Sequence, residues 1–75
     1  MIFEKEEYQK GSDYSSIFKD MFDGGIKTKV RYEKHTFLAS RAKKSQHYVV
    51  SKPSSWLHAS KKWLLGNGYI ILGGK

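Results

Sequence analysis

The chain has 75 residues, no cysteine and a formal net charge of +7 at pH 7. A chain of this length is expected to form a single small domain, residues 1–75, with a thin core. The missing cysteines exclude a disulfide scaffold and a thiolate zinc site. No segment is long and apolar enough to span a membrane, and the acidic beginning does not look like a secretory signal. We therefore expect a cytoplasmic protein without a membrane partner.

Acidic and basic residues are divided unevenly along the chain. Residues 1–25 hold six acidic and three basic residues, whereas residues 26–75 hold eleven basic residues and one acidic residue, Glu33. A segment with such a charge excess attracts polyanions. The alternative is a solvated, charged surface that keeps the protein in solution and binds nothing.

The first third of the chain is predicted to contain one helix. Residues 1–11 are expected to form a loosely ordered lead-in. Asp13 is a good N-cap residue, and the pair Gly24 and Gly25 is typical of a helix end. Between them an apolar stripe recurs at helical spacing: Tyr14, Ile17, Phe18, Met21 and Phe22. Such a stripe indicates a helix that packs on a core rather than a ligand site.

Three strands are predicted in the middle of the chain. Residues 26–32 alternate between two series of side chains with period two, as in a strand. One series is expected to pack on the first helix, and the cations of the other series to face solvent: Lys27, Lys29 and Arg31. Residues 36–40 and 47–51 are predicted as two further strands, separated by a basic loop at 41–46.

A second helix and a last strand are predicted in the final third. Pro53 marks a boundary, and Ser54 can cap a helix that runs to Leu65. On the polar side of this helix we expect His58, Lys61 and Lys62. Residues 69–72 are four large apolar residues in a row, which predicts a strand buried on both faces. Residues 73–75 are expected to be a tail.

These elements predict an α+β fold in the order α-β-β-β-α-β. A small antiparallel sheet of three to four strands would carry both helices packed on one face. The order resembles that of double-stranded-RNA-binding domains and of the small toxins built on the same scaffold. The resemblance lies in the order of elements, with no residue motif in common, so it implies a fold and not a function.

The strongest candidate site is a set of basic residues with one aromatic ring among them. Lys and Arg contact phosphate oxygens, and alternate strand positions lie about 6.6 Å apart, close to the spacing of successive phosphates. Phe37 is expected on the outward side of its strand, where its ring would stack on bases. A shift of the strand register by one residue would place it inside instead. The predicted nucleic-acid contacts are Lys27, Lys29, Arg31, Phe37, Arg41, Lys43, Lys44, His58, Lys61 and Lys62.

A second candidate site is catalytic. Arg31, Glu33 and His35 lie at i, i+2 and i+4 and are expected to share the outward face of one strand. A carboxylate base, a histidine acid and a cation would suffice to cleave RNA through its 2′-hydroxyl. The alternative is an ion pair between Glu33 and a neighbouring cation. The three histidines are too scattered to predict a metal site, and no cofactor motif is present, so neither a metal nor a cofactor is expected.

We therefore expect a small basic protein that binds DNA or RNA through backbone phosphates, without strong sequence specificity. The rival hypothesis is a small regulatory or inhibitor protein, of the type found in phages and mobile elements. Such a protein would bind an acidic protein or a larger nucleic-acid-processing protein. A small ribonuclease is the third hypothesis. The acidic first part could also pair with the basic part of a second copy, as a homodimer or a head-to-tail oligomer.

Overall fold

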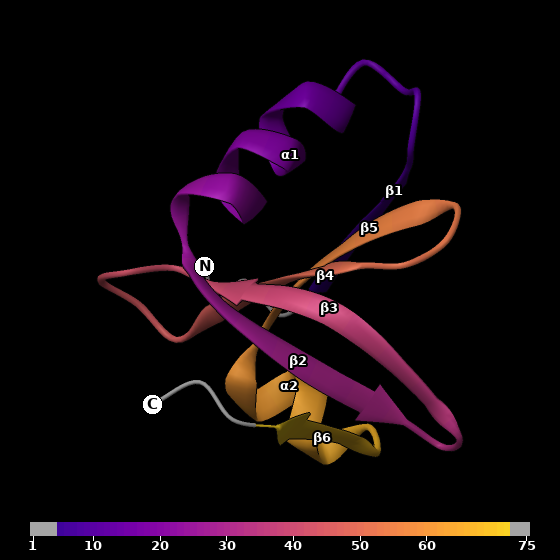
Figure 1. The fold of residues 1–75 in the computed structure, drawn as a ribbon, viewed down its shortest axis with the longest axis vertical. Helices are drawn as coiled ribbons and strands as arrows, with labels where there is room; N and C mark the ends of the chain where they lie inside the picture. The colour runs from indigo at the N-terminus through magenta and orange to yellow at the C-terminus, as the bar shows by residue number, and fades with distance from the viewer. Residues whose placement is uncertain (1–4, 73–75) are drawn as a thin grey trace.

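Six antiparallel strands form a single curved sheet, and one helix packs on each of its sides (Figure 1). The computed structural model describes residues 5–72. The elements are β1 Lys5–Gln9, α1 Ser15–Gly24, β2 Ile26–Tyr32, β3 His35–Arg41, β4 His47–Ser51, β5 Ser55–Ser60, α2 Lys61–Gly66 and β6 Tyr69–Leu72. Across the sheet the strands follow the order β1-β5-β4-β3-β2-β6. Strands β2 to β5 thus form a meander, and β1 and β6 are the two edges.

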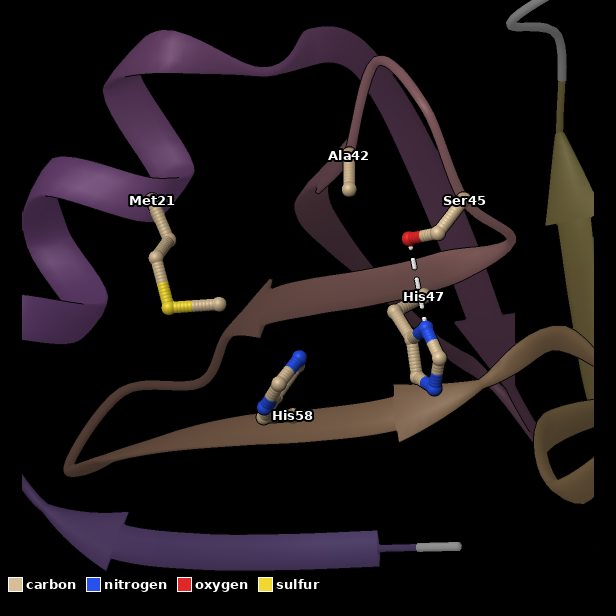
Figure 2. A pocket seen from close by; sticks show the side chains of 5 residues that line it. All are labelled: Met21, Ala42, Ser45, His47 and His58. Carbon is tan, nitrogen blue, oxygen red and sulfur yellow. Dashed lines mark hydrogen bonds between the residues drawn. The ribbon is translucent and has the colours of Figure 1, made fainter. Parts of the chain in front are cut away.

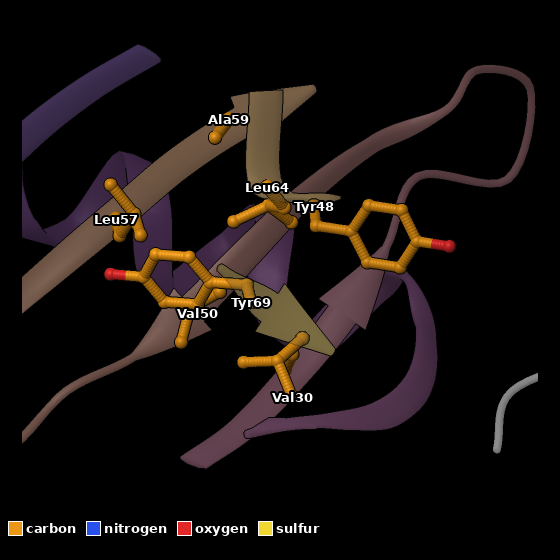
Figure 3. Packing of buried hydrophobic residues seen from close by; sticks show 8 residues of the cluster. Val30, Tyr48, Val50, Leu57, Ala59, Leu64 and Tyr69 are labelled. Carbon is orange, nitrogen blue, oxygen red and sulfur yellow. The ribbon is translucent and has the colours of Figure 1, made fainter. Parts of the chain in front are cut away.

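The two helices lie on opposite faces of this sheet, above and below the strands in Figure 1. Helix α1 packs over β3, β4 and β5, where its Phe18 forms a cluster with Val49 and Trp56. Helix α2 packs on the other face, where its Leu64 joins a larger cluster that includes Val30 (Figure 3). We call these two sides the α1 face and the α2 face.

The predicted sheet of three to four strands with both helices on one face is wrong. Strand β5 occupies the first half of the helix predicted over residues 54–65, and only Lys61–Gly66 is helical. Because one helix covers each side of β5, Trp56 and Leu57 are both buried although they point in opposite directions. The polar–apolar alternation that marks a half-exposed strand is therefore missing from this segment.

The second missed strand is β1, which lies within the residues expected to be a loosely ordered lead-in. It pairs with β5 alone, so it is an edge strand, and four of its five residues are exposed. Charged side chains such as Glu6 and Glu7 are common on edge strands because they oppose further strand pairing. They also remove the apolar signal by which a strand is recognised in a sequence.

The predicted packing of strand 26–32 on the first helix is wrong as well. Val30, with 0% of its surface exposed, points to the α2 face and packs with Leu64. Helix α1 lies on the opposite face, the one to which Lys27, Lys29 and Arg31 belong, but over the neighbouring strands. The apolar residues of strand 26–32 and the apolar stripe of the first helix thus belong to two different clusters, on opposite sides of the sheet.

Several predicted elements are confirmed. The first helix is α1, although its N-cap residue is Tyr14 rather than Asp13. The strands predicted over residues 47–51 and 69–72 are β4 and β6, and a basic loop joins β3 to β4. The first four residues of the expected lead-in and the expected tail, 73–75, lie outside the described residues. Between residues 5 and 72, no helix is long and apolar enough to cross a membrane.

Candidate polyanion-binding surface

Lysines from two distant segments come together at one end of the sheet. Lys43 and Lys44 lie in the loop between β3 and β4, and both side chains are exposed. The N–H group of Lys61 donates a hydrogen bond to the carbonyl of Gln46 in the same loop, at 2.8 Å. Helix α2 therefore begins against this loop. We call the four exposed lysines of the two segments the basic end: Lys43, Lys44, Lys61 and Lys62.

Short-range hydrogen bonds hold both segments of the basic end in place. Ala42 donates through its N–H to the carbonyl of His47 at 2.9 Å, which closes the loop. The Ser60 hydroxyl accepts a hydrogen bond from the N–H of Trp63 at 3.1 Å and caps α2. Lys61 and Lys62 follow in the first turn, where positive charge does not favour a helix. Helix stability therefore does not explain the presence of these two lysines.

Lys27, predicted as a phosphate contact, is engaged by helix α1. Its ammonium group donates a hydrogen bond to the carbonyl of Phe22, lies 4.2 Å from the centre of the Phe22 ring, and is 3.9 Å from a carboxylate oxygen of Asp23. A hydrogen bond from Lys19 and the nearby Lys27 charge hold the pKa of Asp23 below its usual value. Lys27 therefore sits at the C-terminal end of α1, where a cation stabilises a helix.

Lys29 and Arg31 lie on the part of the α1 face that α1 leaves uncovered. Lys29 is paired with Leu38 on one neighbouring strand, and Arg31 with Ile70 on the other. Leu38 is 58% exposed and Ile70 is 47% exposed, so the strand predicted to be buried on both faces is open on one of them. Neither cation forms an ion pair with another residue of the range 5–72. We call this surface the open face: Lys29, Arg31, Leu38 and Ile70.

Two other predicted contacts point to the α2 face. Phe37 is opposite Val30, is half-buried and packs against the α2-side cluster. Its expected outward position is wrong, because the turn at residues 33–34 changes the parity between β2 and β3. Arg41 shares this parity, and its side chain is half-buried at the end of β3.

The same turn separates Arg31 from the other two residues of the predicted catalytic site, Glu33 and His35, which line a pocket of about 450 Å³ together with Lys34. Glu33 has a left-handed backbone, with φ of 56°, and lies between the two strands. His35 is paired with Tyr32, so its side chain points to the α2 face, whereas Arg31 points to the α1 face. The shared face expected for the three residues is wrong. A catalytic role for Glu33 and His35 stays a prediction, because Arg31, the cation expected beside them, points to the other face.

His58 lies on β5, under α1, and not beside Lys61 and Lys62 on a helix. Its ring is 5.7 Å from the rings of Phe18 and His47, and its Nδ1 atom is 3.8 Å from a carboxylate oxygen of Glu6. Desolvation and the neighbouring His47 lower the pKa of His58, against a smaller rise caused by Glu6. The imidazole is therefore mostly neutral at pH 7 and adds little to the positive surface.

A pocket that brings two histidines together was not predicted from the sequence. His47 and His58 line it with Met21 of α1 and with Ala42 and Ser45, and its volume is about 350 Å³ (Figure 2). The Ser45 hydroxyl lies 3.2 Å from Nδ1 of His47. The two histidines are 11 positions apart in the sequence and meet only because β4 and β5 pair. Within residues 5–72, no three His, Asp or Glu side chains form a group that could hold a metal ion.

Comparison with known proteins finds no relative for this chain. No protein-family model, no curated protein and no solved structure matches it significantly. The chemistry and geometry of the surfaces described above are therefore the basis for assigning a function.

Proposed function

We propose that the protein binds the phosphate backbone of DNA or RNA through the basic end. The observation that carries this proposal is the convergence of two lysine pairs, brought together by the hydrogen bond from Lys61 to Gln46. No carboxylate of the described residues forms an ion pair with any of the four lysines. Like charges at one end of the sheet repel one another, and a bound polyanion offsets the repulsion.

The chemistry of this surface favours contact with phosphates over reading of bases. A lysine is a point charge that neutralises a phosphate and releases a counterion. Phe37, the ring predicted to stack on bases, packs against the core instead. With about four phosphates neutralised on duplex DNA, the logarithm of the binding constant should fall with the logarithm of salt concentration with a slope of about −3.6.

Fluorescence anisotropy with short labelled probes tests the proposal. Duplex DNA, duplex RNA and single strands are titrated at about 25–200 mM KCl, over which range the affinity should fall steeply. The variants Lys43→Glu/Lys44→Glu and Lys61→Glu/Lys62→Glu should each weaken binding at least about tenfold, because two attractive charges become repulsive.

A matched control reverses two cations at the opposite end of the sheet. Lys10→Glu/Lys34→Glu changes the net charge by the same amount, but Lys10 follows β1 and Lys34 lies in the β2–β3 turn. Binding should be close to that of the unmodified protein. Equal losses of binding affinity in the control and in the basic-end variants would mean that the affinity depends on net charge and not on the basic end. No binding to any probe at 25 mM KCl would refute the proposal.

A further inference from the structure

We infer that the open face binds helix α1 of a second copy of this chain, so that the protein associates head to tail. Two large aliphatic side chains, Leu38 and Ile70, are each about half exposed on this face, at 58% and 47%. Each is the cross-strand neighbour of a cation. Apolar side chains grouped on an otherwise polar surface commonly mark a site of protein association.

The arrangement of the open face suits a protein partner better than a nucleic acid. Neighbouring strands lie about 4.8 Å apart, and two residues advance about 6.6 Å along a strand. Leu38 and Ile70 lie on the two strands that flank β2, opposite Lys29 and Arg31 respectively. Their positions thus differ by two strands across the sheet and two residues along it, which places them about 12 Å apart with the two cations between them. Aliphatic side chains offer no ring on which bases could stack, but they do pack against apolar groups of a protein.

Helix α1 carries a surface of complementary character. Beside the packed residue Phe18, the helix exposes Tyr14 at 50%, Ile17 at 53% and Met21 at 37%. The Tyr14 ring also lies 4.7 Å from the ring of Tyr8, and Met21 borders the pocket of His47 and His58, so Ile17 is the most exposed of the three. These residues lie at i, i+3 and i+7, in a stripe about 10.5 Å long. Asp20 lies next to this stripe on the helix, and Asp13 lies close to the start of the same side; both are exposed. Apolar groups beside carboxylates match apolar groups beside cations.

The stripe on α1 meets an open face only if that face belongs to another copy. Within one molecule α1 is fixed over β4 and β5 by Phe18, which packs with Val49 and Trp56, whereas the open face lies around β2 and β6. The contact is therefore heterologous, with different surfaces on the two partners, and repeated association gives either a closed ring or a longer assembly. The four lysines of the basic end form no part of the proposed contact, although Lys43 and Lys44 line a pocket with Asp20 and Met21 and therefore border it.

Sedimentation equilibrium on nuclease-treated protein tests the association. Both surfaces are small compared with the roughly 1,600 Å² of a standard interface, so we expect dissociation constants of about 10–500 µM. The weight-average mass should then rise from that of the 8.7-kDa monomer at low micromolar concentration to well above it near 1 mM. A monomer mass at every concentration would overturn the proposal, whether or not a different protein binds the open face.

Charge reversal tests which surfaces meet. Asp20→Arg and Arg31→Asp should each weaken the association at least about tenfold, because like charges then face each other. A one-to-one mixture of the two variants should associate again, since every α1 then meets an open face of opposite charge. Failure of the mixture to associate, when both single variants are monomeric, would contradict the proposed pairing.

A matched pair of leucines tests the apolar part of the contact. Leu38→Asp should abolish association, whereas Leu65→Asp should not, because Leu65 is similarly exposed, at 51%, but lies on α2. Circular dichroism establishes that both variants are folded. If Leu38→Asp fails to fold, the charge-reversal variants still decide the question. Unchanged association in a folded Leu38→Asp variant would refute the use of this face.

Discussion

Leu64→Ala should destabilise the protein strongly, and the same change at the adjacent Leu65 should not. Leu64 is 0% exposed and belongs to the α2-side cluster, whereas Leu65 is 51% exposed on the same short helix (Figure 3). Truncation of a fully buried leucine costs about 3 kcal/mol, within a range of about 2–5 kcal/mol. A chain of this length has a total free energy of unfolding of about 4–11 kcal/mol. The loss at Leu64 is therefore between about a quarter and most of the total.

Urea denaturation followed by tryptophan fluorescence measures this difference. Trp56 belongs to the cluster on the α1 face, and Trp63 packs against the cluster on the α2 face. Tryptophan fluorescence therefore reports on the unfolding of both clusters. In thermal unfolding, a loss of 3 kcal/mol should lower the Tm by about 12–24 °C. Leu65→Ala should change the free energy of unfolding by no more than about 0.5 kcal/mol. Equal effects at the two positions, or a loss below about 1 kcal/mol at Leu64, would refute the packing of α2 on this face.

Two further predictions concern pH and a close backbone contact. The pKa of His58 is lowered in the folded protein from its usual 6.5, chiefly by desolvation, so the unfolded chain takes up a proton first as the pH falls. The free energy of unfolding should be highest above pH 6.5 and should decrease as the pH falls through the pKa of His58 in the folded protein. In the His58→Gln variant, urea titrations between pH 7 and 5 should show a weaker dependence of this free energy on pH. An unchanged dependence in the variant would contradict the prediction. A Cβ atom at Gly25 would lie 2.6 Å from the carbonyl oxygen of Arg41 and would also collide with Ser40. Gly25→Ala should therefore lower the Tm, whereas Gly24→Ala, where the new atom would meet nothing within 4 Å, should not; similar Tm values for the two variants would contradict the close approach.

The elements predictable from the sequence are those whose local pattern is simple. Helix α1 has an apolar stripe with helical spacing, and β2 has clear alternation around Val30. Strand β5 lacks such a pattern because Trp56 and Leu57 are buried under different helices. Strand β1 lacks it because an edge strand keeps charged residues. The missing information is in each case tertiary: which faces are covered, and by what.

The basic residues show the same limit at the level of the site. Their exposure could be predicted residue by residue, but their grouping depends on strand register and on one backbone hydrogen bond to Gln46. Lys27 and Lys29 look equivalent in the sequence, yet Lys27 donates a hydrogen bond to the carbonyl of Phe22 near the end of α1, while Lys29 is exposed beside Leu38. The inward position of Phe37 follows from a two-residue turn that the alternation alone does not reveal.

The positions of the two edge strands bear on the order of folding. Strands β2 to β5 pair with their neighbours in the sequence, but β1 pairs Tyr8 with Trp56, and β6 pairs Tyr69 with Tyr32. Pairings between distant segments form more slowly than local ones, because a long loop must close first. During synthesis, β1 and α1 leave the ribosome before the strands on which they pack have been made. Until β4 and β5 follow, Phe18 lacks Val49 and Trp56, the other buried residues of its cluster, and its apolar ring stays exposed on the nascent chain.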